Sequence, residues 1–170
     1  CLSRGLGMCI RDRFLVLLFS SQNTFAQTQE PLKVQLTMQD VVVFSNNKNT
    51  LFGLKDKSGN IVVDAQYKKL IRLGTSSWII NKKNKYGIMD SSGNILVEPK
   101  FRHVDRMMLK YVKLGNENDY GVYDEKGEII LPNEYMTINM LFGGMFLIKK
   151  NYKYGVADRN GNIILKPIFD

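Results

Sequence analysis

A period of 34 residues is the feature that most constrains what this chain can fold into. In each of four copies an aromatic residue is followed by glycine, then by an aspartate three residues later and a second glycine three residues after that. An isoleucine and a second aromatic residue keep the same phase. A repeat of this length indicates a solenoid, a propeller or a stacked array. The defining columns are Phe52, Gly53, Asp56 and Gly59; Tyr86, Gly87, Asp90 and Gly93; Tyr120, Gly121, Asp124 and Gly127; and Tyr154, Gly155, Asp158 and Gly161.

The residues of each copy favour strands over helices. Each copy carries an apolar, mostly β-branched triplet such as Ile61-Val62-Val63, and such triplets favour strands. The preceding Asp-x-x-Gly is typical of a type I turn with a glycine bulge, which connects hairpins. Each copy is therefore predicted to be strand, tight turn, strand and loop, with a third strand at 77–81, 111–115 or 145–149. Paired helices, which can also repeat at this length, are disfavoured because no window shows a sustained helical period.

The repeat also predicts how the copies pack. The triplets are apolar on both strand faces, so each needs neighbours above and below, which stacked copies supply. The predicted fold class is all-β: tandem 34-residue repeats of about three short antiparallel strands, stacked as an open twisted array. A closed, propeller-like ring is the alternative, although propeller blades usually have four strands. The glycine of each aromatic-glycine pair is expected to make room for an aromatic side chain of the adjacent copy.

Two long motifs carry a resemblance to a known family. Residues 85–90 read KYGIMD and residues 93–101 read GNILVEPKF, and residues 153–158 and 161–169 repeat this frame as KYGVAD and GNIILKPIF. Over residues 44–170 the chain resembles the WG-repeat (KWG-repeat) family, tandem β-rich units named for a Trp-Gly pair. Phe or Tyr replaces the Trp in every copy, and the proline becomes Ala65 in the first copy and shifts to Pro132 in the third. The resemblance implies a bacterial repeat module, often exported, without a general activity.

The N-terminal residues have the layout of a secretory signal. An apolar run at 14–19 follows Arg11 and Arg13, and a polar stretch ends at the small residue Ala26, after which cleavage is expected. A buried strand is the alternative, and the run is too short to span a bilayer. We expect the protein to be periplasmic, on the cell surface or secreted. The predicted segments are a non-native leader at 1–13, a signal peptide at 14–26, a linker with the start of a partial repeat at 27–43, and the repeat domain at 44–170, with copies at about 52–85, 86–119, 120–153 and a truncated 154–170.

The residue census disfavours several chemistries. The only cysteines, Cys1 and Cys9, precede the apolar run, and His103 is the only histidine. A zinc cluster or a Ser-His-Asp relay would therefore have few residues to use. The four column aspartates could form a calcium ladder, but Lys57 and Arg159 directly follow two of them and oppose a cation. We interpret these aspartates as turn residues and predict no catalytic, cofactor-binding or metal-ligating residue.

Charge and aromatic content bear on partners. The net charge is +8, with basic clusters at 82–85 and 149–153, but the equivalent stretch between them carries Glu117 and Asp119. A surface that tracks a nucleic acid should stay positive along the array, so no nucleic-acid partner is predicted. Most aromatic residues lie in the columns and are expected in the core. Tyr111, Tyr123 and Tyr152 lie outside them and are weak candidates for an exposed binding surface.

The sequence thus predicts an exported, non-enzymatic binding or interaction scaffold for a protein or a cell-envelope component. The alternative is a glycan-binding or carbohydrate-active envelope protein. We predict no cofactor and no transmembrane segment, and the oligomeric state stays open. The chain stops at Asp170, so a third strand for the fourth copy would fall near 179–183. The last hairpin is therefore expected to have an unpaired edge and to open more easily than the others.

Overall fold

The computed structural model describes residues 40–170, so the predictions for 1–39, including the signal peptide, lie outside the described residues. The described chain is built from strands and one short 3-10 helix, η1 (Phe142–Gly144). The strands are β1 (Val41–Ser45), β2 (Phe52–Asp56), β3 (Ile61–Tyr67), β4 (Lys69–Leu73), β5 (Ser77–Lys82), β6 (Lys85–Asp90), β7 (Ile95–Phe101), β8 (His103–Met107), β9 (Tyr111–Gly115), β10 (Tyr120–Asp124), β11 (Ile129–Tyr135), β12 (Thr137–Met140), β13 (Phe146–Lys150), β14 (Lys153–Ala157) and β15 (Ile163–Phe169).

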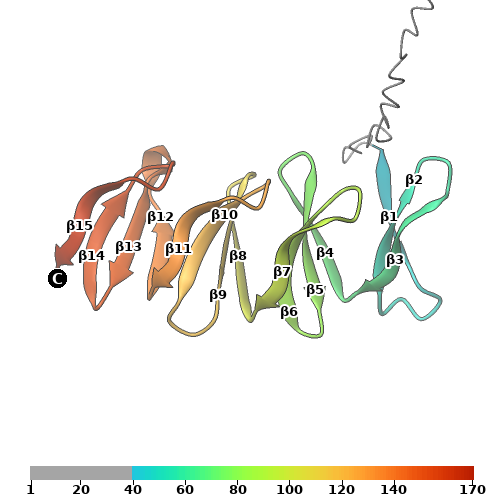
Figure 1. The fold of residues 1–170 in the computed structure, drawn as a ribbon, viewed down its shortest axis with the longest axis horizontal. Coiled ribbons are helices and arrows are strands. Elements are labelled where there is room, and N and C mark those ends of the chain that lie inside the picture. The colour runs from blue at the N-terminus through green and yellow to red at the C-terminus, as the bar shows by residue number, and fades with distance from the viewer. Residues whose placement is uncertain (1–39) are drawn as a thin grey trace, which may run out of the picture. The chain divides into compact units, whose positions relative to one another are not determined.

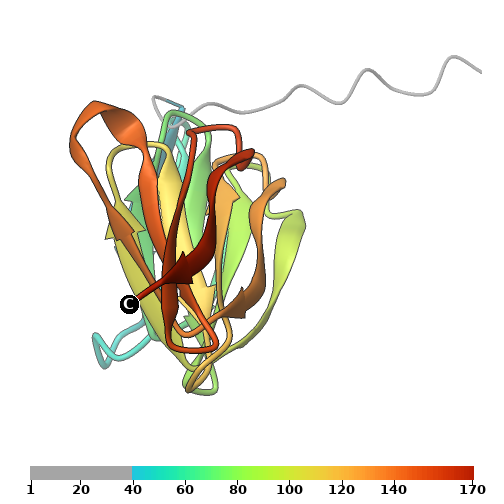
Figure 2. The same cartoon turned by 90° about the vertical axis from the view of Figure 1, so that its left-hand side faces the viewer.

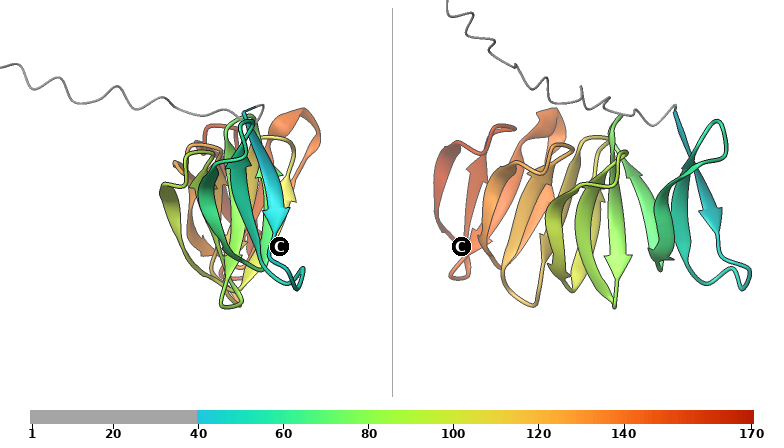
Figure 3. Two further views of the ribbon diagram at one scale, coloured as in Figure 1. Left: turned by 90° about the vertical axis from the view of Figure 1, so that its right-hand side faces the viewer. Right: turned by 45° about the vertical axis from the view of Figure 1, so that its right-hand side comes forward.

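These strands form four antiparallel sheets in which neighbours along the chain are neighbours in the sheet. The first sheet contains β1 to β3, the second β4 to β7, the third β8 to β11 and the fourth β12 to β15. Figure 1 shows the sheets following one another in chain order, with β1 and β15 at opposite ends, and the right-hand view of Figure 3 shows the same order. The predicted all-β open array is confirmed, and the described residues do not close into a ring.

Three of the four sheets have four strands because a segment expected to be a loop is a strand. Residues Lys69–Leu73 pair with β5 along their whole length, from Lys69 opposite Asn81 to Leu73 opposite Ser77. A single residue, Lys68, separates β3 from β4, and its N–H donates to the carbonyl of Asn81 at 2.8 Å. One sequence copy is therefore divided between two sheets: its first hairpin completes one sheet, and its last two strands begin the next.

The apolar side chains form three cores, each between two consecutive sheets. Side chains alternate across a strand, so β5 sends Trp78 and Ile80 toward the first sheet and Ile79 toward the third. Viewed along the row from its β15 end, the sheets overlap, as face-to-face packing requires (Figure 2). The buried members are Val41, Leu54, Val63, Tyr67, Trp78, Ile80 and Met89 in the first core; Leu73, Ile79, Ile88, Val97, Phe101, Val112, Leu114 and Tyr123 in the second; and Met107, Val122, Leu131, Tyr135, Ile138, Phe146, Ile148 and Ala157 in the third.

The expectation that the apolar triplets are buried on both faces is wrong. In Ile61-Val62-Val63 the first residue is exposed, the second is half-buried and only the third is buried. The reason is position, because each triplet lies in an edge strand, such as β3 or β7. The strands that contribute to two cores are the inner ones, such as β5 and β6.

The expectation that the glycine of each aromatic-glycine pair makes room for an aromatic side chain of the adjacent copy is wrong. This glycine faces the neighbouring strand of its own sheet. In the second sheet, Tyr86 pairs with Phe101, whereas Ile88 pairs with Val97. Between these two pairs the chain moves two residues along β6 but four residues along β7. The extra residues of β7 form a bulge opposite Gly87. A bulge of this kind accommodates proline, which cannot donate to the ladder, and Pro99 lies within it.

The expected unpaired edge of the final hairpin is present, because β15 is an edge strand, but β3, β7 and β11 are edge strands too, so this edge does not distinguish the last sheet. β15 pairs with β14 in the same irregular register that β7 shows with β6, and the fourth sheet has four strands like the two before it. The third strand of a copy belongs to the following sheet, so the fourth sheet has four strands without one from the fourth copy. The difference lies in packing: Leu165 of β15 is 47% exposed, whereas the equivalent Val97 of β7 is 8% exposed.

Candidate functional site

The column aspartates are held by their own turns. Asp90 Oδ1 accepts hydrogen bonds from the N–H groups of Ser92 and Asn94, both at 2.9 Å, and its Oδ2 accepts from the Asn94 side chain at 2.8 Å. The N–H of Gly93 donates to the Asp90 carbonyl at 3.2 Å. The equivalent bond from the residue four positions on measures 2.8 Å at Asp56, Asp124 and Asp158.

These bonds favour the ionised carboxylate. The side chain of Asn60 lowers the pKa of Asp56, with backbone N–H groups of the turn adding to the effect. The side chain of Asn162 lowers the pKa of Asp158 in the same way. Within residues 40–170 no group of three or more His, Cys, Asp or Glu side chains is arranged to hold a metal ion. The turns therefore use their carboxylates to fix the backbone.

The three tyrosines outside the columns have three different environments. Tyr152 is 73% exposed in the turn between β13 and β14. Tyr111 is half-buried, with its ring edge-on to Phe146 at 5.9 Å. Tyr123 is only 6% exposed and is not a surface residue, which corrects the prediction; burial raises its pKa, and its hydroxyl donates to Asn133. The sequence could not reveal this, because the residues at this repeat position differ in type: Met89 and Ala157 are buried as Tyr123 is, whereas Lys55 is half-buried.

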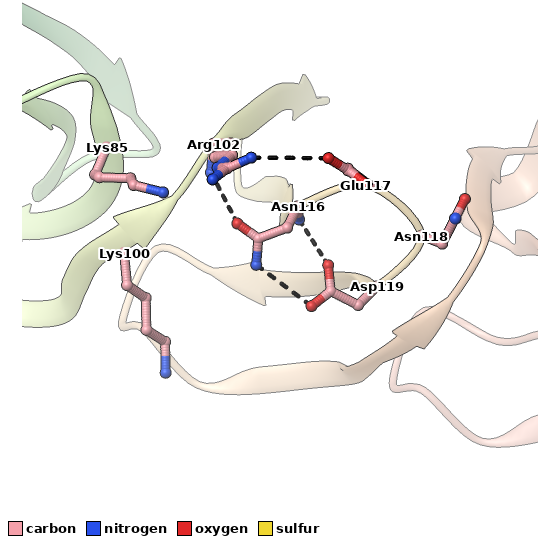
Figure 4. A pocket seen from close by; sticks show the side chains of 7 residues that line it. All are labelled: Lys85, Lys100, Arg102, Asn116, Glu117, Asn118 and Asp119. Atoms are coloured by element: carbon pink, nitrogen blue, oxygen red, sulfur yellow. Dashed lines mark hydrogen bonds and ion pairs between the residues drawn. The ribbon is translucent and has the colours of Figure 1, made fainter.

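A polar cleft lies where the second and third sheets meet. It has a volume of about 610 Å³. Lys85 comes from β6, Lys100 from β7 and Arg102 from the link to β8, and the opposite wall is the turn between β9 and β10 (Figure 4). Its lining residues are Lys85, Lys100, Arg102, Asn116, Glu117, Asn118 and Asp119.

The acidic side chains of the polar cleft are engaged within it. Asp119 accepts from the backbone N–H of Asn116 at 2.7 Å and from its side chain at 3.3 Å (Figure 4). Glu117 lies 3.7 Å from the Arg102 guanidinium. By contrast, neither Lys85 nor Lys100 forms an ion pair with a described residue. The cleft therefore offers two ammonium groups to an incoming acidic group.

The glutamate of the polar cleft is open to solvent. The Glu117 side chain is 80% exposed and paired with the Arg102 cation. This arrangement can bind charged groups.

A second cavity lies at the opposite end of β9, between the third and fourth sheets. It has a volume of about 860 Å³ and contains no acidic lining residue. We call it the cationic cavity. Neither it nor the polar cleft was predicted, because the period fixes where loops recur but not which side chains converge. The residues that line it are Arg106, Met108, Leu109, Lys110, Tyr111, Gly143, Gly144 and Arg159.

Stacked antiparallel sheets with a fixed turn and a fixed glycine define a β-repeat protein. The sequence model of the family described as "WG containing repeat" matches residues 52–85, 86–106, 120–154 and 154–170, and the chain belongs to this family. Neither a curated protein nor a solved structure gives a significant match. Among the described residues, no helix is long and apolar enough to cross a membrane.

Proposed function

We propose that this WG-repeat chain is an exported, non-enzymatic scaffold that binds a partner protein of the cell envelope through the polar cleft. The observation that carries the proposal is the pair of lysines, Lys85 and Lys100, that share the cleft without an acidic partner among the described residues. Acidic side chains of a partner would meet these ammonium groups along the cleft, next to Arg102. Complementary charge of this kind raises the association rate and selects the partner.

The surroundings of the two lysines support binding by a folded surface. Lys100 Nζ lies 5.4 Å from the centroid of the Phe101 ring, which holds the ammonium group near the cleft wall. Phe101 itself belongs to the core between the second and third sheets. The lysine therefore stands on a rigid support, and ordering it upon binding costs less than ordering a free surface lysine.

The binding experiment places a photo-crosslinking amino acid at Asn118, which lines the polar cleft. Crosslinking in cells is expected to give one recurrent partner, and the yield should fall in the double variant Lys85→Glu/Lys100→Glu. The matched control is Lys48→Glu/Lys126→Glu, which changes the net charge equally at exposed lysines outside the cleft. Equal crosslinking by all three chains, or equal loss in both variants, would contradict binding through the cleft.

Export is the second part of the proposal and rests on the sequence of residues 11–26. A short apolar run after two arginines and before Ala26 has the order of a secretory signal. When the chain is expressed in a bacterium with a start codon supplied, the secreted or periplasmic product should begin at Gln27. N-terminal sequencing decides this, and a soluble cytoplasmic product that keeps residues 14–19 would refute it.

A glycan partner is the alternative, and one feature favours it. Tyr152 is 73% exposed, and Lys149 Nζ lies 6.0 Å from its ring centroid. An exposed tyrosine can stack on a sugar face while a nearby ammonium group donates to its hydroxyls. A glycan array should then show binding that Tyr152→Ala abolishes and Lys85→Glu/Lys100→Glu leaves unchanged.

A further inference from the structure

The cationic cavity between the third and fourth sheets combines three positive side chains with apolar walls. Arg106 comes from β8, Lys110 from the turn between β8 and β9, and Arg159 from the turn between β14 and β15. Tyr111 and Leu109 add apolar surface. The nearby acidic groups are already bonded elsewhere: Asp105 pairs with Lys113 at 3.1 Å, and the Asp158 carboxylate holds its own turn. The lining itself carries three positive side chains and no acidic one.

The preceding interface shows why this cavity is open. Glu125 occupies the same repeat position as Arg159, one copy earlier. Its Oε2 atom accepts from the Thr75 N–H at 2.7 Å, and a Cβ atom on Gly74 would overlap this carboxylate, so the acid fills the gap between the second and third sheets. Arg159 cannot accept such a bond.

The arginine bonds in a different direction. Arg159 Nη2 donates to the carbonyl oxygen of Gly143 at 3.4 Å. The equivalent carbonyl one copy earlier belongs to Leu109, and it accepts instead from the N–H of Gly74 at 2.6 Å. At the interface between the second and third sheets, the carbonyl of Leu109 joins two loops by a backbone bond to Gly74. One copy later, the carbonyl of Gly143 bonds instead to the cationic side chain of Arg159. An acid-to-base exchange at one repeat position accompanies the opening of the cavity.

The turn on the other side of the cavity is also unusual. Met108 takes the left-handed conformation (φ 58°) that Gly74 takes one copy earlier (φ 62°). This conformation is unfavourable for a side chain other than glycine, by about 1–2 kcal/mol. Strained residues concentrate at binding sites, and Met108 is 63% exposed at the cavity. The family match stops at residue 106 and resumes at 120, so it does not cover this turn.

We propose that the cationic cavity binds a small organic anion with an apolar body, of the class of aromatic carboxylates. Its volume of about 860 Å³ lies within the range of small-molecule sites. Arg106 and Arg159 can each hold a carboxylate through two parallel hydrogen bonds, and Lys110 adds a third charge. Tyr111 and the apolar side chains can contact the body of the ligand. This site is separate from the polar cleft and does not depend on the function proposed for that cleft.

The test is an NMR titration of the full ¹⁵N-labelled chain with para-biphenylcarboxylate. The amide signals of Lys110, Tyr111, Gly143 and Gly144 should shift and saturate together, while those of Thr75 and Ser77 at the filled interface should not. The neutral para-biphenylcarboxamide should bind about tenfold more weakly, because it loses the charge-assisted hydrogen bonds. Equal affinity for acid and amide, or shifts confined to β15, would overturn the proposal.

Variants locate the site without relying on stability. Arg159→Glu restores the acid found at Glu125 and should weaken binding by at least about tenfold. Lys57→Glu makes the same change in charge at the same repeat position of the first sheet and should leave the affinity unchanged. Loss of affinity in both variants would indicate a general charge effect and overturn the site. A further probe is an acidic peptide with phenylalanine between two aspartates. If this peptide binds at the cavity and biphenylcarboxylate does not, the cavity binds a protein segment, and the small-molecule proposal is overturned.

Discussion

Gly87 of β6 faces the carbonyl oxygen of Val97 in β7 so closely that a Cβ atom on the glycine would overlap that oxygen. The same atom would lie 2.8 Å from the backbone nitrogen of Pro99. Gly121 stands in the same relation to the carbonyl of Leu131, and Gly155 to that of Leu165. The aromatic-glycine signature of this family member is thus explained by a bulge in the paired strand, which comes too close for any side chain.

Gly87→Ala should therefore destabilise the chain strongly. The obstructing atoms are backbone atoms that cannot rotate away, so we expect a loss of about 1–3 kcal/mol or more in the free energy of unfolding. Gly143→Ala is the control, because a Cβ atom there meets nothing within 4 Å and only the left-handed backbone is strained. Urea unfolding measures both. A Gly87→Ala chain as stable as the Gly143→Ala chain would show that the bulge can move.

The bond between Glu125 and Thr75 should stabilise the interface between the second and third sheets. Removing the carboxylate in Glu125→Ala leaves the Thr75 N–H to water, and because this site is exposed we expect a cost of only about 1 kcal/mol. Glu128→Ala removes the same charge from the same turn. Glu128 uses its backbone N–H for the bond to Asp124, so this variant should change stability by less than about 0.5 kcal/mol.

The comparison of these two glutamates in thermal and urea unfolding separates a specific contact from a general change in charge. If both variants lose stability equally, the sheet interface does not depend on the Glu125 carboxylate. A larger loss in Glu128→Ala than in Glu125→Ala would contradict the contact directly.

Local features of the fold could be predicted because they depend on neighbours in sequence. Asp90 and Gly93 define a turn through bonds that span four residues, and the triplet at 95–97 follows directly as a strand. By contrast, β4 was missed, since neither glycine nor proline separates it from β3. The single corner residue Lys68 is fixed by a bond to Asn81, which lies far along the chain.

The candidate sites could not be predicted for a related physical reason. The residues that directly follow the column aspartates, which include Glu125 and Arg159, vary in type between copies. From the sequence, this variation indicates only that the aspartates do not bind calcium. In the structure this position lies where consecutive sheets meet, so its residue type decides whether the gap is filled or open. Likewise Lys85 and Lys100 both line the polar cleft because β6 and β7 are paired.

The lowered pKa values of Asp56 and Asp158 predict acid sensitivity of the first and last turns. Because the folded pKa is below the ordinary value of 3.8, the unfolded chain binds more protons in this range. The stabilisation is fully present above that ordinary value and is lost as the pH falls through the lower folded pKa. Urea unfolding at a series of pH values should show stability falling below about pH 4, and less steeply in Asp56→Asn/Asp158→Asn. An unchanged slope in the variant would assign the acid sensitivity to other groups.

Hydrogen exchange should reveal the difference in packing between the second and fourth sheets. Ile88 pairs with Val97 in one, and Val156 pairs with Leu165 in the same relative register in the other, so these amides have matched strand positions. Val97 is 8% exposed and Leu165 is 47% exposed, so opening β15 uncovers little additional apolar surface. Local opening free energies follow such burial, and we expect the Val156 and Leu165 amides to exchange faster than those of Ile88 and Val97.

The exchange measurement contains its own control, because the two turns have the same hydrogen bonds. The N–H groups of Asn94 and Asn162 each donate to an aspartate Oδ1, at 2.9 and 2.8 Å. If the fourth sheet opens as a unit, Asn162 should also lose protection relative to Asn94. If β15 frays only from its C-terminal end, the Asn162 amide should keep its protection relative to Asn94. Equal protection of Leu165 and Val97 in the full chain would show that the face of β15 is covered in solution, which would contradict the packing difference that the burial of these two residues predicts.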